Sequence, residues 1–156
     1  MKKTDLIKKE LEKILSLMKI KAEIKTGEEK DFLYFNIFPQ EEVDIKLLVG
    51  WHGRNLSALQ NLLKIVLNKK LEGETIPPFV LDVADYWQKK EKNLVSLAQE
   101  AAEKVKSNQR EMVLDPMSPR ERRIIHLTLS KISGVTSESI GEGKERRVVI
   151  KLADKE

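Results

Sequence analysis

The stretch LLVGWHGRNLSALQ, residues 47–60, decides how the first half of this chain is interpreted. It places Gly50 and Gly53 three positions apart, with Trp51 and His52 between them and apolar residues on both sides. A plain connection between two helices needs one glycine, to end the first helix. The second glycine needs another explanation. Two positions without side chains let a tight turn expose successive backbone N–H groups.

Those amides come just before a helix predicted over residues 54–69, so they lie where partial positive charge favours anions. Arg54 adds a full charge at the same point. The loop therefore suits a phosphodiester backbone held close to the protein. A GxxG sequence alone is a weak signal, because many helix–helix turns contain one. Its surroundings strengthen it, since residues 45–71 include no acidic residue and five basic ones: Lys46, Arg54, Lys64, Lys69 and Lys70.

Hydrophobic spacing predicts the order αββααβ around this loop. The expected elements are a helix over 5–19 behind a Thr4–Asp5 cap, a half-buried strand over 20–25, a turn at 26–31, an antiparallel strand over 32–38, a helix over 42–49, the helix over 54–69 and a strand over 77–84. The apolar stripe of the 54–69 helix is expected to contain Leu56, Leu59, Leu63 and Val66, widened by Leu62 and Ile65.

The second half is predicted to run α, short β, α, β, β. Its elements are a long helix over 86–107, a short strand over 111–116, a helix after Ser118 and strands over 135–140 and 145–152. The long helix is expected to bury a seam of Leu94, Leu97, Ala101 and Val105.

The helix after Ser118 has the clearest boundary signals in the chain. Ser118 can cap it, Pro119 suits the first helical position, and Glu121 three residues after the cap completes a capping box. Gly134 is expected to end it.

The segment RRIIH, residues 122–126, holds a second candidate site on that helix. Arg122 and His126 are four positions apart, so they share one helix face. Together they can grip a phosphate, the arginine with a planar fork of donors and the histidine with one more. An isolated Arg-x-x-x-His pair is more often a surface pair without a function, and clustered charge is often only a solvated face. The motif alone does not decide between these interpretations.

Two resemblances connect these features. Residues 1–84 resemble a type II KH domain, which has the order αββααβ, a three-stranded sheet with helices on one face, and a GxxG loop that clamps single-stranded nucleic acid. Residues 85–154 resemble the R-three-H domain, a small α/β module named for its Arg-x-x-x-His motif and associated with single-stranded nucleic acids. The two are joined by the long helix, and together they resemble the Jag (KhpB) family. The likeness is close over roughly residues 40–152, and the Jag-N domain of several members is not expected here.

The resemblance implies an α+β, non-enzymatic, cytoplasmic regulator that binds single-stranded RNA, with single-stranded DNA as the other candidate ligand. The alternative is an adaptor that pairs with a small KH protein of the KhpA type in control of cell elongation and division. A homodimer is also open. The expected nucleic-acid-binding residues, of which Arg123, Arg146 and Arg147 rest on charge alone, are Gly50, Trp51, His52, Gly53, Arg54, Lys64, Arg122, Arg123, His126, Arg146 and Arg147.

Trp51 departs from the family pattern, because the middle positions of such loops are usually small, polar or basic. Its side chain is expected to stack on a base or ribose, to plug the core or to contact a partner. His52 is expected to bond a phosphate or water rather than to act in catalysis.

Composition and missing motifs argue against an enzyme. The 156 residues include two histidines and no cysteine, so a zinc site would rest mainly on carboxylates. There is no GxxxxGK[ST], GxSxG or HExxH sequence. A two-metal nuclease built from Asp82, Asp85 and Glu91 is conceivable, but the two aspartates are better interpreted as strand-end and helix-cap residues. No cofactor, metal or membrane insertion is expected, and the net charge of +4 favours an anionic partner only weakly.

Overall fold

The computed structural model describes residues 1–154, which divide into one unit over Met1–Trp87 and a second that begins at Gln88. Each unit combines helices with a three-stranded sheet, so the fold is α+β, as expected. None of the helices within residues 1–154 has both the length and the apolar character needed to cross a bilayer.

The first unit has the predicted order αββααβ, with one short 3₁₀ turn added. Its elements are α1 (Lys3–Leu17), β1 (Ala22–Glu29), β2 (Phe32–Pro39), α2 (Glu42–Val49), the turn η1 (Trp51–Gly53), α3 (Arg54–Lys70) and β3 (Phe79–Val83). The strands lie in the order β1-β2-β3. β1 pairs antiparallel with β2, as predicted, and β3 pairs parallel with β2.

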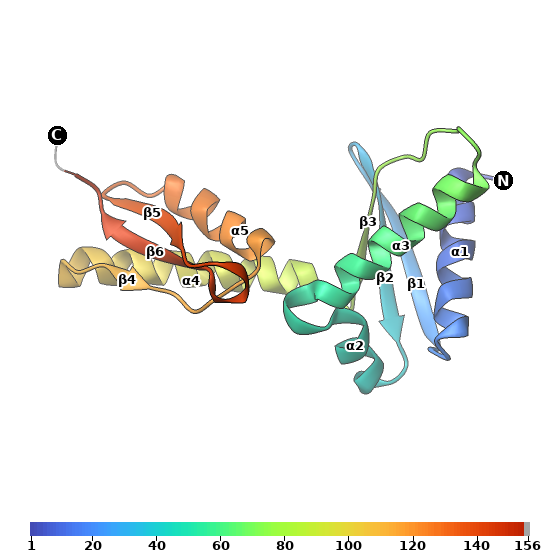
Figure 1. The fold of residues 1–156 in the computed structure, drawn as a ribbon, viewed down its shortest axis with the longest axis horizontal. Coiled ribbons are helices and arrows are strands. Elements are labelled where there is room, and N and C mark those ends of the chain that lie inside the picture. Colours follow the sequence, from blue (N-terminus) through green and yellow to red (C-terminus); the bar gives the residue numbers. More distant parts are fainter. Residues whose placement is uncertain (155–156) are drawn as a thin grey trace. The chain divides into compact units, whose positions relative to one another are not determined.

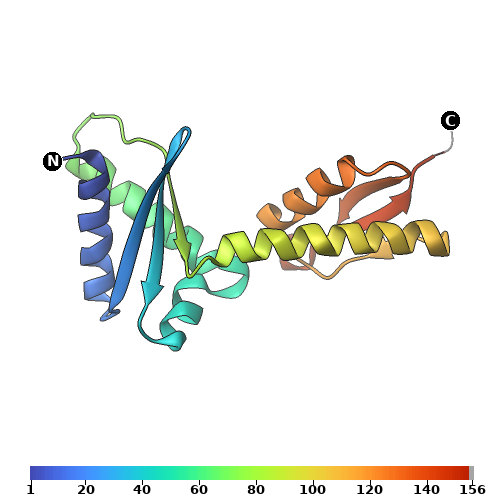
Figure 2. The same ribbon diagram turned by 180° about the vertical axis from the view of Figure 1, so that it is seen from behind.

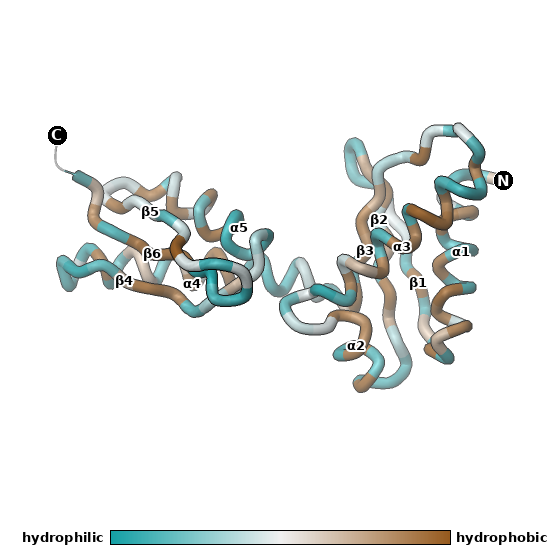
Figure 3. Tube along the Cα trace, viewed as in Figure 1, coloured by the Kyte–Doolittle hydropathy of each residue, from teal (hydrophilic) through white to brown (hydrophobic). Residues whose placement is uncertain are grey.

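The helices of this unit share one core with one face of the sheet. Phe35 and Ile37 of β2 are directly paired with Leu81 and Val83 of β3, so these four side chains point to the same face, and all are fully buried. α3 crosses that sheet in front of the strands in Figure 1 and behind them in Figure 2. In Figure 3 the tube of α1 alternates between hydrophobic and hydrophilic segments, because apolar residues such as Leu11 recur along its buried face.

Three local predictions for this unit were wrong. The turn predicted at 26–31 is shorter, because β1 continues to Glu29, which pairs with Phe32. The predicted Thr4–Asp5 cap does not form: the N-cap residue of α1 is Lys2, without a side-chain hydrogen bond.

The third concerns the apolar stripe of α3. Leu62 and Ile65 are 47% and 58% exposed. Leu56, Leu59 and Leu63 are buried as predicted, but the buried series continues with Leu67 rather than Val66.

The second unit contains most of the long helix α4 (Tyr86–Asn108), then β4 (Met112–Val113), α5 (Pro119–Ser130), β5 (Val135–Ile140), the turn η2 (Gly143–Glu145) and β6 (Arg147–Leu152). The strands form an antiparallel sheet in the order β4-β6-β5. This is the predicted order α, short β, α, β, β.

The core of the second unit lies between α4, α5 and one face of this sheet. From α4 it takes Leu94, Ala98, Ala101, Ala102 and Val105. Three residues of the predicted seam are confirmed, whereas Leu97 is 40% exposed and the alanines at 98 and 102 are buried in addition. The capping box is confirmed: the Ser118 hydroxyl accepts the Glu121 N–H at 3.3 Å, and the Glu121 carboxylate accepts the Ser118 N–H at 2.7 Å. The helix ends at Ser130, before Gly134.

Candidate nucleic-acid interface

The GWHG loop reverses the chain through three residues with left-handed backbone angles. The φ values are 69° at Gly50, 48° at His52 and 79° at Gly53. A Cβ on Gly50 would lie 2.4 Å from Cγ of Asn55. The Asn55 amide occupies this space because it donates to the Leu47 carbonyl at 2.7 Å, satisfying the last turn of α2. Gly50 is therefore required both by its backbone angle and by this side chain.

Gly53 has a packing reason of its own. A Cβ there would lie 2.6 Å from Cζ2 of Trp87 and 3.3 Å from Cε1 of Tyr86, both at the end of the first unit. Gly53 itself is buried. Contact with these two aromatic rings therefore accounts for the second glycine without a ligand, a reason that the local sequence pattern does not reveal.

The other side chains of the loop are accessible. The Trp51 side chain is 48% exposed, which excludes the core-plug interpretation. Its ring centroid lies 4.0 Å from that of His52 and 5.8 Å from the Arg54 guanidinium carbon, within the range of a cation–π contact. Lys64, farther along α3, is exposed, and its Nζ lies 5.9 Å from the Phe79 ring centroid. The loop thus combines an exposed aromatic platform with positive charge.

The second cluster lies where α5 packs against β5 (Figure 1). His126 Nδ1 lies 2.7 Å from Ser137 Oγ, and His126 Nε2 lies 2.8 Å from Ser139 Oγ. Both ring nitrogens of His126 are therefore held by serine hydroxyls. Arg122, one turn earlier on α5, donates from Nε to the Met117 carbonyl at 3.3 Å. Arg146, just before β6, donates from Nη1 to the Gly141 carbonyl at 2.8 Å.

Arg122 and Arg146 both act electrostatically on His126. Partial burial lowers the pKa of His126 below its ordinary value of 6.5, and the positive charges of Arg122 and Arg146 lower it further. Neither arginine forms an ion pair with a carboxylate of residues 1–154. The surroundings therefore hold two uncompensated positive charges beside a neutral imidazole, an arrangement suited to an anion.

Two other predicted residues lie apart from this cluster. Arg147 is paired directly with Ile140, whereas Ser139 is paired with Val148, so Arg147 projects from the opposite face of the sheet. Its Nη2 lies 3.0 Å from Glu145 Oε2. Arg123 is exposed on α5, and its charge is not among those that lower the pKa of His126. The structure thus groups Gly50–Arg54 in the first unit and Arg122, His126 and Arg146 in the second.

Sequence reasoning missed three residues that shape these groups: Asn55, Ser137 and Ser139. The serines had a usable signal, because residues two apart in VTSESI face the same side of a strand. Asn55 had none, since its role depends on the exact path of the loop.

The aspartates considered for a nuclease have structural partners. Asp82 Oδ1 accepts the Trp87 N–H at 3.1 Å at the start of α4, and Oδ2 accepts the Tyr34 hydroxyl at 2.8 Å. Burial and this bond raise the pKa of Tyr34. Asp85 accepts the Asn36 amide at 2.6 Å. The strand-end and helix-cap interpretation is confirmed for Asp82. Among residues 1–154, no three His, Cys, Asp or Glu side chains are grouped as a metal site.

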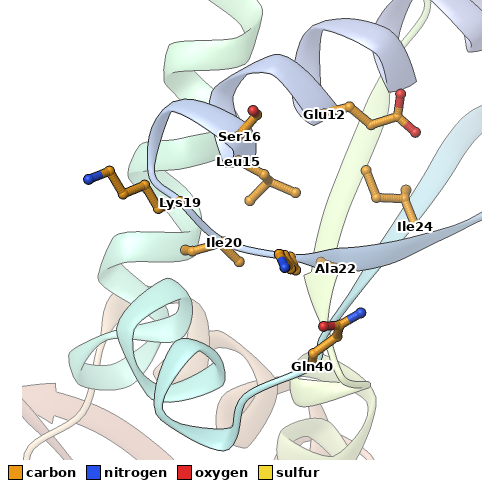
Figure 4. A pocket seen from close by; sticks show the side chains of 9 residues that line it. Glu12, Leu15, Ser16, Lys19, Ile20, Ala22, Ile24 and Gln40 are labelled. Carbon is orange, nitrogen blue, oxygen red and sulfur yellow. The ribbon is translucent and has the colours of Figure 1, made fainter.

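A surface hollow of about 520 Å³ lies between the end of α1 and the start of β1 (Figure 4). Leu15, Lys19 and Gln40 are among its lining residues, and none of the predicted site residues lines it.

Known proteins are similar to part of the second unit and to the larger part of the chain. Residues 92–152 match the R-three-H domain family. The chain is 38% identical over 109 residues to RNA-binding protein KhpB of Clostridium symbiosum, covering 70% of this chain and 48% of that protein. It is 31% identical over 132 residues to RNA-binding protein KhpB of Bacillus subtilis, covering 83% and 61%. For RNA-binding protein KhpB of Lactiplantibacillus plantarum the identity is 37% over 106 residues, covering 68% and 32%.

The chain belongs to the KhpB (Jag) family. It spans less than two thirds of the length of each of these KhpB proteins. Arg122 and His126 lie inside the matched R-three-H segment, at the spacing from which the domain takes its name.

Proposed function

We propose that this chain is a non-enzymatic, cytoplasmic protein that binds single-stranded RNA through its R-three-H domain and the GWHG loop. The observation that carries the proposal is the pair of guanidinium groups of Arg122 and Arg146, whose charges act on His126. Within residues 1–154 these two guanidinium groups donate to backbone carbonyls. The names of the KhpB relatives support RNA as the ligand.

The first unit acts in this proposal as a type II KH domain. Its sheet order, its helices on one face and the loop before α3 support that assignment. The loop would hold the RNA backbone against the N-terminus of α3, where helix amides and Arg54 favour a phosphate. Trp51 would stack on a base or ribose, and Lys64 would extend the positive surface along α3.

RNA binding is tested by fluorescence anisotropy with a labelled, unstructured 15-nucleotide RNA at several salt concentrations. If three to five phosphates are neutralised, log K falls with log salt at a slope of roughly −2 to −3.5. DNA of the same sequence serves as the comparison ligand, because no residue of the two groups identifies a 2′-hydroxyl. Absence of measurable RNA affinity at low salt contradicts the proposed function.

The loop assignment needs substitutions that leave its glycines in place, because side chains at Gly50 and Gly53 would collide with Asn55 and Trp87. Trp51 and His52 offer a cleaner test. The W51D/H52D chain adds two negative charges beside the α3 N-terminus, and asparagine and aspartate both tolerate the left-handed angle at His52.

W51N/H52N is the matched control, since it removes the same rings without adding charge. We expect W51D/H52D to weaken RNA binding at least 10-fold more than W51N/H52N, because the added charges repel a phosphate. Equal loss in both variants assigns the contact to the rings, and wild-type affinity in both contradicts a role for the loop.

A second candidate function is protein pairing, with a KhpA-type KH protein or a second copy of the chain. Exposed apolar side chains favour it: Val43 is 69% and Leu47 53% exposed, one turn apart on α2, and Trp51 in the loop that follows is 48% exposed. Leu47→Glu, compared with wild type by sedimentation and by RNA anisotropy, separates the two functions. Loss of assembly with intact RNA affinity supports pairing, and an unchanged monomer in both chains contradicts self-association.

A further inference from the structure

Arg122, His126 and Arg146, with Ser137 and Ser139, form the R-three-H cluster. The hydrogen bonds of His126 limit which of these side chains can donate to a phosphate. Both imidazole nitrogens lie within hydrogen-bond distance of serine hydroxyls, at 2.7 and 2.8 Å. A neutral imidazole has one N–H donor and one acceptor nitrogen. The ring therefore donates to one serine, accepts from the other, and keeps no N–H for a ligand.

The two serines are not equivalent in this arrangement. The serine that donates to the imidazole uses its only hydroxyl hydrogen. The serine that accepts the ring N–H keeps its own hydrogen, which is free to donate elsewhere. Whichever tautomer is present, one serine hydroxyl thus keeps a hydrogen that the imidazole does not use. In the other tautomer of His126 the two serines exchange these donor and acceptor roles.

The position of the serines makes that donor available to a ligand. Ser137 and Ser139 are two residues apart on β5, so they share one face of the sheet, and β5 is an edge strand. Both side chains are half-buried rather than enclosed. His126 holds them from α5, and the charges of Arg122 and Arg146 act on the same imidazole. Two serine hydroxyls and the charges of two guanidinium groups therefore act on the same imidazole.

We propose that Ser137 and Ser139 are direct phosphate-binding residues of the R-three-H cluster, and that His126 is a positioning residue that orients their hydroxyls. This inference rests on the proposed binding of RNA and adds which atoms contact it. It replaces the sequence-based expectation that the histidine itself donates to the phosphate.

The serines are tested with S137A/S139A in the RNA anisotropy assay described above. Because a hydrogen bond to a charged group is strong, we expect the double variant to bind about 10-fold more weakly than wild type. The slope of log K against log salt stays unchanged, since no charge is removed. S137T/S139T keeps both hydroxyls on a residue suited to strands and is expected to bind like wild type.

Thr136→Ala is the matched control, because Thr136 lies on the same strand and points to the opposite face. If circular dichroism shows that S137A/S139A does not fold, the single serine variants replace it. Wild-type affinity in the folded alanine variants overturns the serine assignment while RNA binding stands. Absence of RNA binding by the wild-type chain is a different result, and it removes the proposed function as well.

The positioning role of His126 is tested by a double-mutant cycle. His126→Ala is expected to weaken binding in the wild-type background but to have no further effect in S137A/S139A. His126→Gln keeps one donor and one acceptor for the serines, so it is expected to recover most of the affinity. Additive losses in the cycle, or no recovery by glutamine, would mean that the imidazole contacts RNA itself and would overturn the positioning role.

Discussion

The two candidate binding groups are built in different ways. In the first unit the loop depends on backbone shape: Gly50 and Gly53 take left-handed angles and fit against Asn55 and Trp87. In the second unit the cluster depends on side chains that project from a regular helix and strand, with His126 bonded to Ser137 and Ser139. Substitutions of the loop glycines therefore act first on folding, whereas substitutions in the cluster act first on charge and hydrogen bonding.

This difference determines which experiments are informative. A glycine variant that loses binding does not distinguish a lost ligand contact from a disturbed loop. A cluster variant such as Arg122→Ala leaves the surrounding helix intact, because Arg122 is only half-buried and bonds a single carbonyl. Unfolding free energy and RNA affinity, measured on matched variants of both groups, test whether the loop glycines act on folding and the cluster side chains on binding.

The largest effect is expected for Gly53→Ala. The left-handed angle and the collision with Trp87 together are expected to cost about 3 kcal/mol of unfolding free energy. Urea unfolding followed by tryptophan fluorescence reports on this unit, because both tryptophans of the chain, Trp51 and Trp87, lie in it.

Two other glycines separate the causes of that loss. Gly73 has φ 97° and nothing within 4 Å of an added Cβ, so Gly73→Ala is expected to show only the backbone cost, about 1 kcal/mol. Gly27 has space and an ordinary angle, so Gly27→Ala is expected to change stability by less than about 0.5 kcal/mol. If Gly53→Ala is no worse than Gly73→Ala, the contact with Trp87 is not what excludes a side chain.

In the second unit the largest loss of stability is expected for Glu121→Gln. The Glu121 side chain is fully buried, lies 3.0 Å from Lys90 Nζ and bonds the Ser118 N–H. Removing its charge is expected to cost about 2 kcal/mol, less than for a fully buried pair because Lys90 keeps some solvent contact. Unfolding is followed by far-UV circular dichroism. Glu138→Gln breaks the exposed pair with Lys151, so a similar loss in that control would contradict the importance of burial.

The sequence predicted the order of elements and the capping box because these depend on local periodicity and on residues three or four apart. It failed where tertiary packing decides. Leu62 and Leu97 fit an apolar helix pattern but lie at the surface, and the core instead takes Leu67 and a row of alanines on α4. The packing reason for a glycine at position 53 could not be predicted either, because Trp87, which it contacts, lies 34 positions away in the chain (87 − 53 = 34).

Within the candidate site, the sequence identified Arg122 and His126 through their spacing and the loop through its glycines. It did not separate Arg146, which lies near His126, from Arg147, which projects from the other sheet face. Adjacent residues in an extended segment alternate sides, but the starting side is fixed only by pairing with β5. Charge alone could not make that distinction.

This alternation gives a prediction for RNA binding. Arg122→Ala and Arg146→Ala are each expected to weaken RNA binding about 10-fold and to reduce the salt slope by about 1, as for loss of one phosphate contact. Arg147→Ala is the matched control and is expected to leave the slope unchanged, because its guanidinium faces away and is paired with Glu145. Equal effects of Arg146→Ala and Arg147→Ala in the anisotropy assay would contradict a one-sided interface.

The smallest effect concerns the titration of His126, followed by NMR of its ring protons. Its midpoint is expected below 6.5, and Arg122→Ala or Arg146→Ala is expected to raise it, because each removes a repelling charge. Arg123→Ala is the control, since Arg123 is not among the groups that lower this pKa. An unchanged midpoint in both arginine variants would mean that the guanidinium groups do not face the imidazole.

The same pKa fixes the direction of a stability change with pH. A folded-state pKa below the unfolded value of 6.5 means that the unfolded chain binds the proton more tightly. The contribution of His126 to stability is therefore complete above pH 6.5 and declines as the pH falls toward the folded-state pKa.

A bound phosphate near Arg122 and Arg146 offsets their charges and raises the midpoint of the His126 titration. RNA is therefore expected to shift the His126 titration upward in the wild-type chain and less in S137A/S139A.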